Sequence, residues 1–281
     1  MRRRDVPLVF FTILSQWSIG FILCLTALTL MGDGAGPGLQ TGLNATNPVL
    51  LALLLIVVAT TFSFMHLGNP VNALKSIRNL ATSWLSREIL AIGLYSFTLL
   101  LLLLDAWIFV KPDFSEILLL AASLAGLLLL WTMTGVYLIP TVPPWNNPYT
   151  AIAFSLATLS LGLAACLALD MGGLLELGRA VSTGLASLLV LILVLEVVFS
   201  HLNQRRLVRL DTGFNGPAPD RGGLLGLYRL RVGLLLLAIL VNVMAVTALI
   251  DPGWLVIGLF LAVMQEIATR VLFYASYFRS G

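Results

Sequence analysis

The sequence predicts an all-α integral membrane protein: a bundle of eight transmembrane helices with a short interfacial helix between the second and third. Apolar residues make up 59% of the 281 residues and charged residues only 10%, whereas soluble domains contain about 25% charged residues. Apolar stretches of about 20 residues, the length that crosses a bilayer as a helix, recur along the whole chain. No polar stretch is long enough for a soluble domain, so we expect residues 1–281 to form a single integral membrane domain.

The predicted spans, in order, cover residues 8–31, 49–67, 88–110, 116–138, 150–169, 181–201, 231–250 and 254–277. The first span exceeds the roughly 7–15 apolar residues of a signal peptide, which predicts a retained helix. Backbone polar groups in lipid must be satisfied within the segment, so the spans are expected to be helical. Glycine and proline are concentrated between the spans, where helices are expected to end.

The connection over residues 68–87 has a helical pattern of its own. Asn69-Pro70 is a favourable helix start, a capping side chain followed by proline at the first helical position. From there apolar residues follow helical spacing on one side and polar residues, including Lys75 and Arg78, occupy the other. With Trp84 as an anchor, this pattern predicts an interfacial helix above a pocket floored by the ends of the second and third spans.

The basic residues are distributed very unevenly between the two sides of the predicted membrane. Of the 16 Lys and Arg residues, only Lys111 and Arg179 fall on the side opposite the N-terminus. The positive-inside rule then places both termini in the cytoplasm, in a multi-pass protein of a bacterial or archaeal cytoplasmic membrane. Because these residues lie in short membrane-flanking loops, the net charge of +3 is not a nucleic-acid signal. Because successive helices cross the membrane in alternating directions, most polar candidates are expected on the same side as the N-terminus. They are His66, Glu88, Tyr137, Trp145, His201 and Arg270.

His66 is one of two histidines and ends a predicted span, with Glu88 at the start of the next. Ionisable residues at membrane depth are costly and indicate function. Oxidising a quinol removes two electrons and two protons, and a neutral imidazole with a nearby carboxylate can receive those protons. The alternative is structural: His66 bonds a backbone carbonyl, and Glu88 pairs with Arg87 or Arg78.

Other polar residues have structural alternatives as well. Glu266 and Arg270 lie four apart on the last span, a spacing that suits an ion pair within the bundle as well as a direct catalytic role. Bis-histidine haem would use both His66 and His201 and leave neither for a quinol, so no haem is expected. Cys24 and Cys166 share no metal or redox spacing and are expected to be small core residues.

Three ordered motifs carry a resemblance to a known family. Residues 65–70 (Met-His-Leu-Gly-Asn-Pro), continuing to 86–89, residues 141–145 (Thr-Val-Pro-Pro-Trp) and residues 266–274 (Glu-Ile-Ala-Thr-Arg-Val-Leu-Phe-Tyr) resemble segments of the membrane anchor subunit of dimethyl sulfoxide reductase, the DmsC family. Residues 7–16 are similar to that family's opening helix. The resemblance covers essentially the whole length.

This resemblance implies the anchor of a three-subunit molybdoenzyme in anaerobic respiration. Such an anchor binds and oxidises menaquinol, carries no haem, and passes electrons to a subunit with four 4Fe–4S clusters that feeds a molybdopterin catalytic subunit. The protein itself would be a non-catalytic electron-transfer subunit. The resemblance assigns the quinol-site histidine to His66 and the acidic residue before the third helix to Glu88. The remaining candidates for holding the quinol are Arg78, Trp84, Arg87, Tyr137, Trp145 and Arg270.

Two other functions are compatible with eight helices. A secondary transporter of a small organic solute would need polar groups near the membrane midplane, often in inverted repeats, whereas the polar residues here gather at one interface. A purely structural anchor that docks soluble subunits is the other. The basic N-terminus and the basic loop over residues 202–230 leave open which side of the membrane the catalytic subunits occupy, and the terminal acceptor is open too.

Overall fold

The computed structural model describes residues 6–31, 43–66, 79–108, 115–175, 177–212, 221–247 and 251–276. Within these residues are eight helices long and apolar enough to cross a membrane, which confirms the predicted class. The elements are α1 (Val6–Met31), α2 (Leu43–His66), α4 (Trp84–Ile108), α5 (Ser115–Tyr137), α6 (Pro148–Met171), α7 (Arg179–Thr212), α8 (Arg221–Val246), the 3₁₀ helix η3 (Pro252–Trp254) and α9 (Leu255–Ala275).

The prediction of a long loop over residues 202–230 is wrong. Helix α7 continues to Thr212 and α8 already begins at Arg221. Hydropathy marks the part of a helix that lies in lipid, whereas a helix ends where a breaker stops it. After Gly184 the next glycine is Gly213, and Pro217 follows it, so residues 202–212 contain neither glycine nor proline.

The predicted interfacial helix lies mostly in residues 67–78, outside the described residues. Residues 79–83 form a turn in which the backbone N–H groups of Thr82 and Ser83 both donate to the carbonyl of Asn79, at 3.1 and 3.0 Å. Trp84 is the first residue of α4 rather than part of a separate surface helix.

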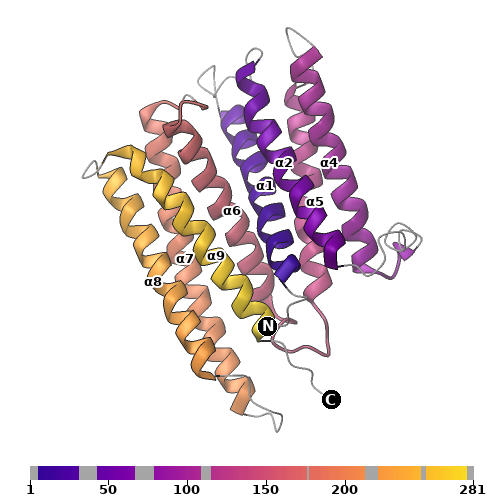
Figure 1. Cartoon of the computed structure of the whole chain (residues 1–281), viewed down its shortest axis with the longest axis vertical. Coiled ribbons are helices and arrows are strands. Elements are labelled where there is room, and N and C mark those ends of the chain that lie inside the picture. The colour runs from indigo at the N-terminus through magenta and orange to yellow at the C-terminus, as the bar shows by residue number, and fades with distance from the viewer. Residues whose placement is uncertain are drawn as a thin grey trace.

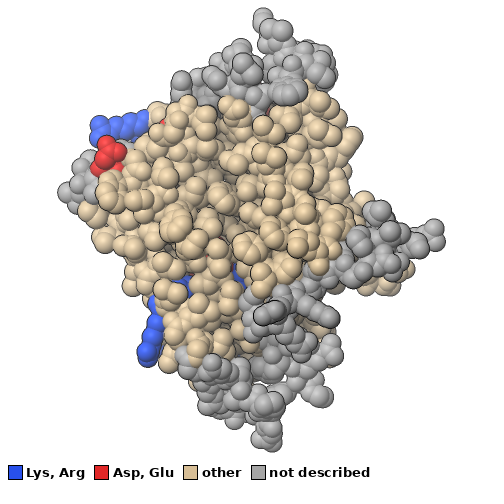
Figure 2. Space-filling view, viewed as in Figure 1, with Lys and Arg blue, Asp and Glu red and all other residues tan. Residues whose placement is uncertain are grey.

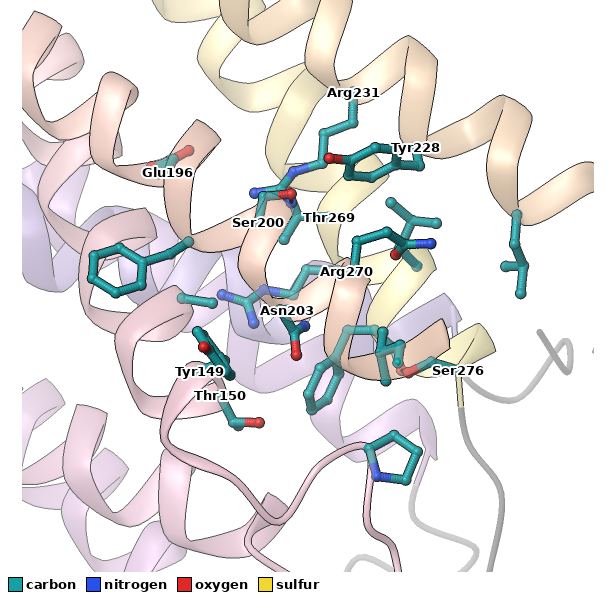
Figure 3. Close-up of a pocket in the computed structure, with 18 of the residues that line it drawn as sticks. Tyr149, Thr150, Glu196, Ser200, Asn203, Tyr228, Arg231, Thr269, Arg270 and Ser276 are labelled. Carbon is teal, nitrogen blue, oxygen red and sulfur yellow. Dashed lines mark hydrogen bonds between the residues drawn. The ribbon is translucent and has the colours of Figure 1, made fainter. Parts of the chain in front are cut away.

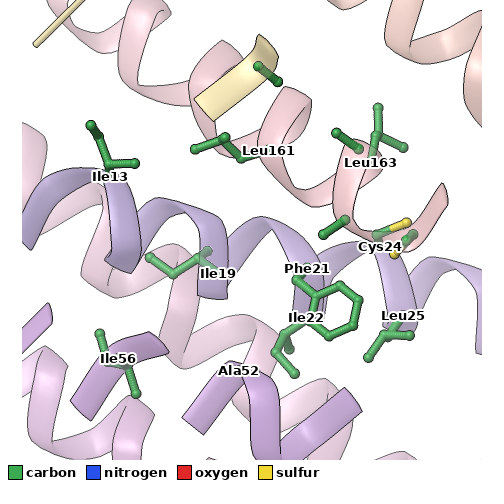
Figure 4. Packing of buried hydrophobic residues seen from close by; sticks show 14 of the residues in the cluster. Ile13, Ile19, Phe21, Ile22, Cys24, Leu25, Ala52, Ile56, Leu161 and Leu163 are labelled. Atoms are coloured by element: carbon green, nitrogen blue, oxygen red, sulfur yellow. The ribbon is translucent and has the colours of Figure 1, made fainter. Parts of the chain in front are cut away.

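The helices form two groups of four that lie side by side (Figure 1): α1, α2, α4 and α5 in one, and α6, α7, α8 and α9 in the other. Helix α1 connects them, because it packs against α2 and α5 and also against α6 and α9. Its buried side chains, among them Ile19, Phe21 and Ile22, lie in the middle of the apolar core (Figure 4). Cys24 and Cys166 are buried free thiols, as predicted.

Helices α1 and α6 approach each other through two glycines. A Cβ atom on Gly20 would lie 1.8 Å from the carbonyl oxygen of Thr158, and one on Gly162 would lie 2.2 Å from the carbonyl carbon of Gly20. Small residues let helix backbones come this close in a membrane, where dispersion contacts drive helix association. The two helix groups are therefore held together at backbone contact distance.

Buried hydroxyls link helices within the first group. The Ser18 Oγ donates to the carbonyl of Ala52 at 2.7 Å and lies 2.9 Å from the Tyr95 hydroxyl, which ties α1 to α2 and α4. Thr26 and Ser123 pair at 2.6 Å between α1 and α5. On the face shown in Figure 2, the charged side chains among the described residues lie at the upper left and in the lower half, and an uncharged belt separates them.

Candidate functional site

Glu88 is a buried acid in the first turns of α4. The helix begins after Ser83, whose Oγ accepts a hydrogen bond from the Ser86 N–H at 3.2 Å, as an N-cap residue does. The side chain of Glu88 is 5% exposed. It interacts electrostatically with the hydroxyls of Tyr137 and Tyr274. Helices α4, α5 and α9 thus bring a carboxyl group and two hydroxyl groups into one buried, electrostatically linked set.

The two tyrosines form a buried hydroxyl pair. Tyr137 is the last residue of α5 and Tyr274 lies in the last turn of α9. Their hydroxyl oxygens are 2.6 Å apart, so one donates to the other. Because α5 belongs to the first helix group and α9 to the second, the pair joins the two groups at one end of the molecule.

Aromatic rings surround the pair. The Tyr137 ring contacts Phe154, Trp145 and Phe273 at centroid distances of 5.5, 5.6 and 5.3 Å. The Trp145 ring stacks on Phe273 with centroids 5.1 Å apart, and its Nε1–H donates to the Phe273 carbonyl at 2.9 Å. We name Tyr137, Trp145, Phe154, Phe273 and Tyr274 the aromatic cluster.

Trp145 is held in place by the turn between α5 and α6. The side-chain amide of Asn147 donates to the Pro144 carbonyl at 2.6 Å, and the Thr150 Oγ1 donates to the carbonyl of Trp145 at 2.6 Å. Arg206 of α7 donates to the Pro143 carbonyl at 2.8 Å. These three side chains satisfy carbonyls that the proline-rich turn leaves without helical partners.

Arg270 contacts the aromatic cluster through Phe154 and is fully buried, with 0% of its surface exposed. Its Nη2 donates to the Gln16 Oε1 on α1 at 2.6 Å, and its Cζ lies 3.9 Å from the centroid of the Phe154 ring. No hydrogen bond joins it to Glu266 in the described part of the chain. Glu266 instead accepts a hydrogen bond from Gln265 at 2.7 Å. The i, i+4 spacing therefore does not give the hydrogen-bonded ion pair that it suggests.

Trp84 and Arg87 form a second contact at this end. The Arg87 guanidinium lies 4.5 Å from the Trp84 ring centroid and donates to the carbonyls of Leu80 and Ala81 at 2.8 and 2.7 Å. Trp84 meets Trp131 edge to face at 5.0 Å. Arg87 thus links the turn before α4 to the Trp84 ring at the start of the helix.

Gly135 makes room for Trp84, because a Cβ there would lie 2.4 Å from the Trp84 ring. We expect Gly135→Ala to lower the free energy of unfolding by about 1–3 kcal/mol through overpacking. In a Trp84→Leu background the same substitution should cost little, because the ring is gone. Thermal melting of the four proteins in a double-mutant cycle measures this coupling. Equal costs in both backgrounds would contradict it.

Two sequence-predicted residues fall outside these contacts. His66 is the last residue of α2, and only its place in the helix is described. Arg78 lies outside the described residues. Helix α2 packs against α4, and residues 67–83 connect the end of α2 to the start of α4. His66 and Glu88 therefore belong to the ends of two neighbouring helices that are consecutive in the described structure.

A cavity of about 300 Å³ lies between α6, α7, α8 and α9. Figure 3 shows side chains of Ser200 and Asn203 from α7, Arg231 from α8 and Arg270 from α9 around it. Its inner wall includes Glu196 and Glu266, both nearly fully buried. Its volume lies at the lower end of the range for ligand pockets, about 300–1,000 Å³.

Several of these residues have no distinct signal in the sequence. Tyr274 stands inside a recognisable motif without a role of its own, and Gln16 only ends the segment that is similar to the opening helix. Gln265 and Arg231 are not among the predicted candidates. The available signal is their polarity inside apolar spans, which marks a residue for attention without naming its partner. His201, by contrast, is exposed.

Comparison with known proteins decides the family. The family model described as DMSO reductase anchor subunit (DmsC) matches residues 1–276. The protein belongs to the DmsC family. One relative is the C subunit of the anaerobic dimethyl sulfoxide reductase of Haemophilus influenzae, which is 32% identical over 59% of this sequence and 58% of the relative. Another is the YnfH subunit of an anaerobic dimethyl sulfoxide reductase of Escherichia coli K12, which is 35% identical over 56% of this sequence and 54% of the relative.

The C subunit of the anaerobic dimethyl sulfoxide reductase of Escherichia coli K12 is 28% identical to this DmsC-family protein. The match covers 78% of the sequence described here and 76% of the relative. The matches to the first two relatives span little more than half of their length. No solved structure matches the protein. The protein is thus a DmsC-family, multi-pass membrane protein with eight candidate spans in its described residues.

Proposed function

We propose that this anchor binds and oxidises menaquinol and passes the electrons to an iron–sulfur subunit of a molybdoenzyme reductase in anaerobic respiration. The observation that carries the proposal is the buried group formed by Glu88, Tyr137 and Tyr274. A quinol hydroxyl must give up its proton as its electrons leave, so its site needs acceptors at membrane depth. The carboxylate of Glu88, which interacts electrostatically with the hydroxyl pair of Tyr137 and Tyr274, supplies one.

The roles proposed for the individual residues follow from their chemistry. His66 accepts the proton of one quinol hydroxyl, since a neutral imidazole is a base near physiological pH. Glu88 accepts the second proton. The rings of Trp84, Tyr137 and Trp145 offer apolar and aromatic surface to the quinone ring. The cationic side chains Arg78, Arg87 and Arg270 stabilise the negative charge that develops when a quinol hydroxyl ionises.

The partners are proposed from the names of the relatives. Two relatives are named as the C subunit of an anaerobic dimethyl sulfoxide reductase, and a subunit so named belongs with other reductase subunits. We propose that the four-cluster 4Fe–4S subunit takes the electrons and delivers them to a molybdopterin catalytic subunit. Haem has no part in this scheme. Membership of an anchor family leaves the solute-transporter alternative without support.

The test is His66→Arg in the assembled complex. Menaquinol-dependent reduction of dimethyl sulfoxide should be abolished, because an arginine cannot accept the proton. Reduction driven by a dye that feeds electrons directly to the soluble subunits should stay at the level of the unmodified complex, which shows that the complex has assembled. His201→Arg changes the other histidine, which is exposed, and is the matched control with full activity. Normal menaquinol-driven turnover in His66→Arg would remove His66 from the site.

A further inference from the structure

The cavity between α6, α7, α8 and α9 has its charged side chains at its inner end. They are Glu196, Arg231, Glu266 and Arg270. Glu266 precedes Ser276, which lines the cavity near the end of α9, by ten residues, or about 15 Å along the helix. Near the end of α7 and the start of α8, which we call the mouth, the wall is formed by neutral side chains such as Leu207, Val208 and Leu224. A phospholipid needs the opposite order, with its charged headgroup at the surface and its tails inside.

Several buried polar atoms on the cavity wall have no hydrogen-bond partner among the residues that the structure describes: Glu266 Oε2, Arg270 Nε, Arg270 Nη1, Arg231 Nε and Asn203 Oδ1. All four residues line the cavity. The side chains of Glu266 and Arg270 are 1% and 0% exposed, and that of Arg231 is 8% exposed. Buried polar atoms without partners cost free energy, which water molecules remove when there is room for them.

The cavity has that room. Its volume of about 300 Å³ is many times the roughly 30 Å³ that one water occupies in the liquid. Water also needs two to four polar partners, and carboxylate, guanidinium and amide atoms supply both acceptors and donors. The geometry therefore favours a chain of water molecules that extends from Glu266 to the mouth.

The two glutamates on the wall are not equivalent. Both oxygens of Glu196 are occupied, since Oε1 accepts from Ser160 at 2.7 Å and Oε2 accepts from Gln265 at 2.9 Å. Glu266 uses only Oε1, which accepts from the same Gln265 amide at 2.7 Å. Its Oε2 has no partner within the described residues. Glu196 is thus fixed by its donors, and Glu266 keeps one oxygen that can take up a proton.

The tyrosine pair lies beside the part of the cavity nearest the end of α9, because Tyr274 stands two residues before Ser276. Arg270 lines the cavity and interacts electrostatically with Glu266, Tyr137 and Tyr274. Phe273 belongs both to the cavity wall and to the aromatic cluster. Glu88, the tyrosine pair, Arg270 and Glu266 are therefore electrostatically linked, and Arg270 lies between Tyr274 and Glu266 along α9.

We propose that this cavity is the proton exit of the anchor and that Glu266 is its proton-transfer residue. The inference rests on the proposed function. When both O–H bonds of the quinol break, two electrons go to the iron–sulfur clusters of the partner subunit. The two protons leave one after the other: the Glu266 carboxylate binds each one at Oε2, releases it to the water in the cavity, and returns to its charged form. Arg270, which interacts electrostatically with Glu266, stabilises that charged form.

The first test is turnover of the intact complex carrying Glu266→Gln. The isosteric amide keeps the hydrogen bond from Gln265 but cannot carry the proton. Menaquinol-driven turnover should fall at least tenfold with an increased solvent deuterium isotope effect, Glu266→Asp should recover part of the rate, and binding of a quinone analogue should stay within twofold. Dye-driven activity reports assembly. Glu116→Gln, an exposed acid in the first turn of α5, is the control.

The second test measures water access and does not depend on quinol oxidation. Leu156 lines the cavity and is 8% exposed, whereas Leu161 on the same helix is 0% exposed and does not line it. A small, charged thiol reagent that cannot cross the membrane should modify Leu156→Cys at least tenfold faster than Leu161→Cys in the intact complex. Equal, slow modification of the two would show that the cavity is dry and would overturn the proposal.

The remaining outcomes are separable. Full menaquinol-driven turnover in Glu266→Gln, or loss of analogue binding together with turnover, would overturn the proton role of Glu266 while leaving the proposed function standing. If the unmodified complex does not oxidise menaquinol, the proposed function fails, and the proton exit fails with it because the protons have no source.

Discussion

Glu88→Gln is expected to lower menaquinol-dependent turnover of the assembled complex by about 100-fold or more, the range in which positioned proton acceptors contribute. Glutamine has nearly the same shape as glutamate and still forms hydrogen bonds, but it cannot accept the proton that the quinol gives up. Because the side chain is only 5% exposed, bulk water cannot readily take its place. Menaquinol-driven and dye-driven rates, measured on the same preparation, separate this effect from a loss of assembly.

The matched control is again Glu116→Gln, whose parent side chain is exposed at the opposite end of the bundle. It should change neither rate. A Glu88→Gln complex that oxidises menaquinol at the unmodified rate would remove the carboxylate from the mechanism and return Glu88 to a structural role.

Gly20→Ala is expected to prevent stable packing of the two helix groups. The added Cβ would lie 1.8 Å from the Thr158 carbonyl oxygen and would also approach the backbone of Gly162. Backbone atoms of a packed helix cannot move aside as a flexible side chain can, so α1 and α6 must separate. We expect a loss of at least about 3 kcal/mol of stability, the upper end of ordinary overpacking costs, seen as a lower melting temperature and less folded protein in the membrane.

Gly93→Ala is the control for this substitution, because a Cβ on Gly93 of α4 meets nothing within 4 Å in the described structure. It should be neutral or stabilising, since alanine favours helices over glycine by about 1 kcal/mol. If both variants melt alike, the close contact between α1 and α6 does not limit stability.

Much of the architecture follows from the sequence because a bilayer restricts the possibilities. Apolar stretches of about 20 residues have to be helices, so their number and order can be predicted without knowledge of tertiary contacts. The exceptions are the parts of helices outside the lipid. Residues 202–212 and 221–230 are helical although they are rich in arginine, because hydropathy does not register a helix that continues into water.

The site is predictable to a smaller extent. Glu88 stands out as an acid at the start of a span, and the structure buries its side chain. The partner of Arg270 could not be predicted in this way. It is Gln16, 254 positions away, and local spacing suggests Glu266 instead. The hydroxyl pair of Tyr137 and Tyr274 likewise joins residues 137 positions apart, and neither position carries a local signal of the other.

An eight-span membrane anchor with its polar candidates at one end can be read from the residues alone, because span length and residue type are local properties that the bilayer selects. Which of those polar groups meet is a matter of tertiary packing. A side chain such as Arg270 can turn toward its own helix or toward a neighbour, and the choice depends on how closely the neighbour packs. Here the contact between Gly20 and Gly162 brings α1 and α6 to backbone distance, and α1 carries Gln16 to Arg270.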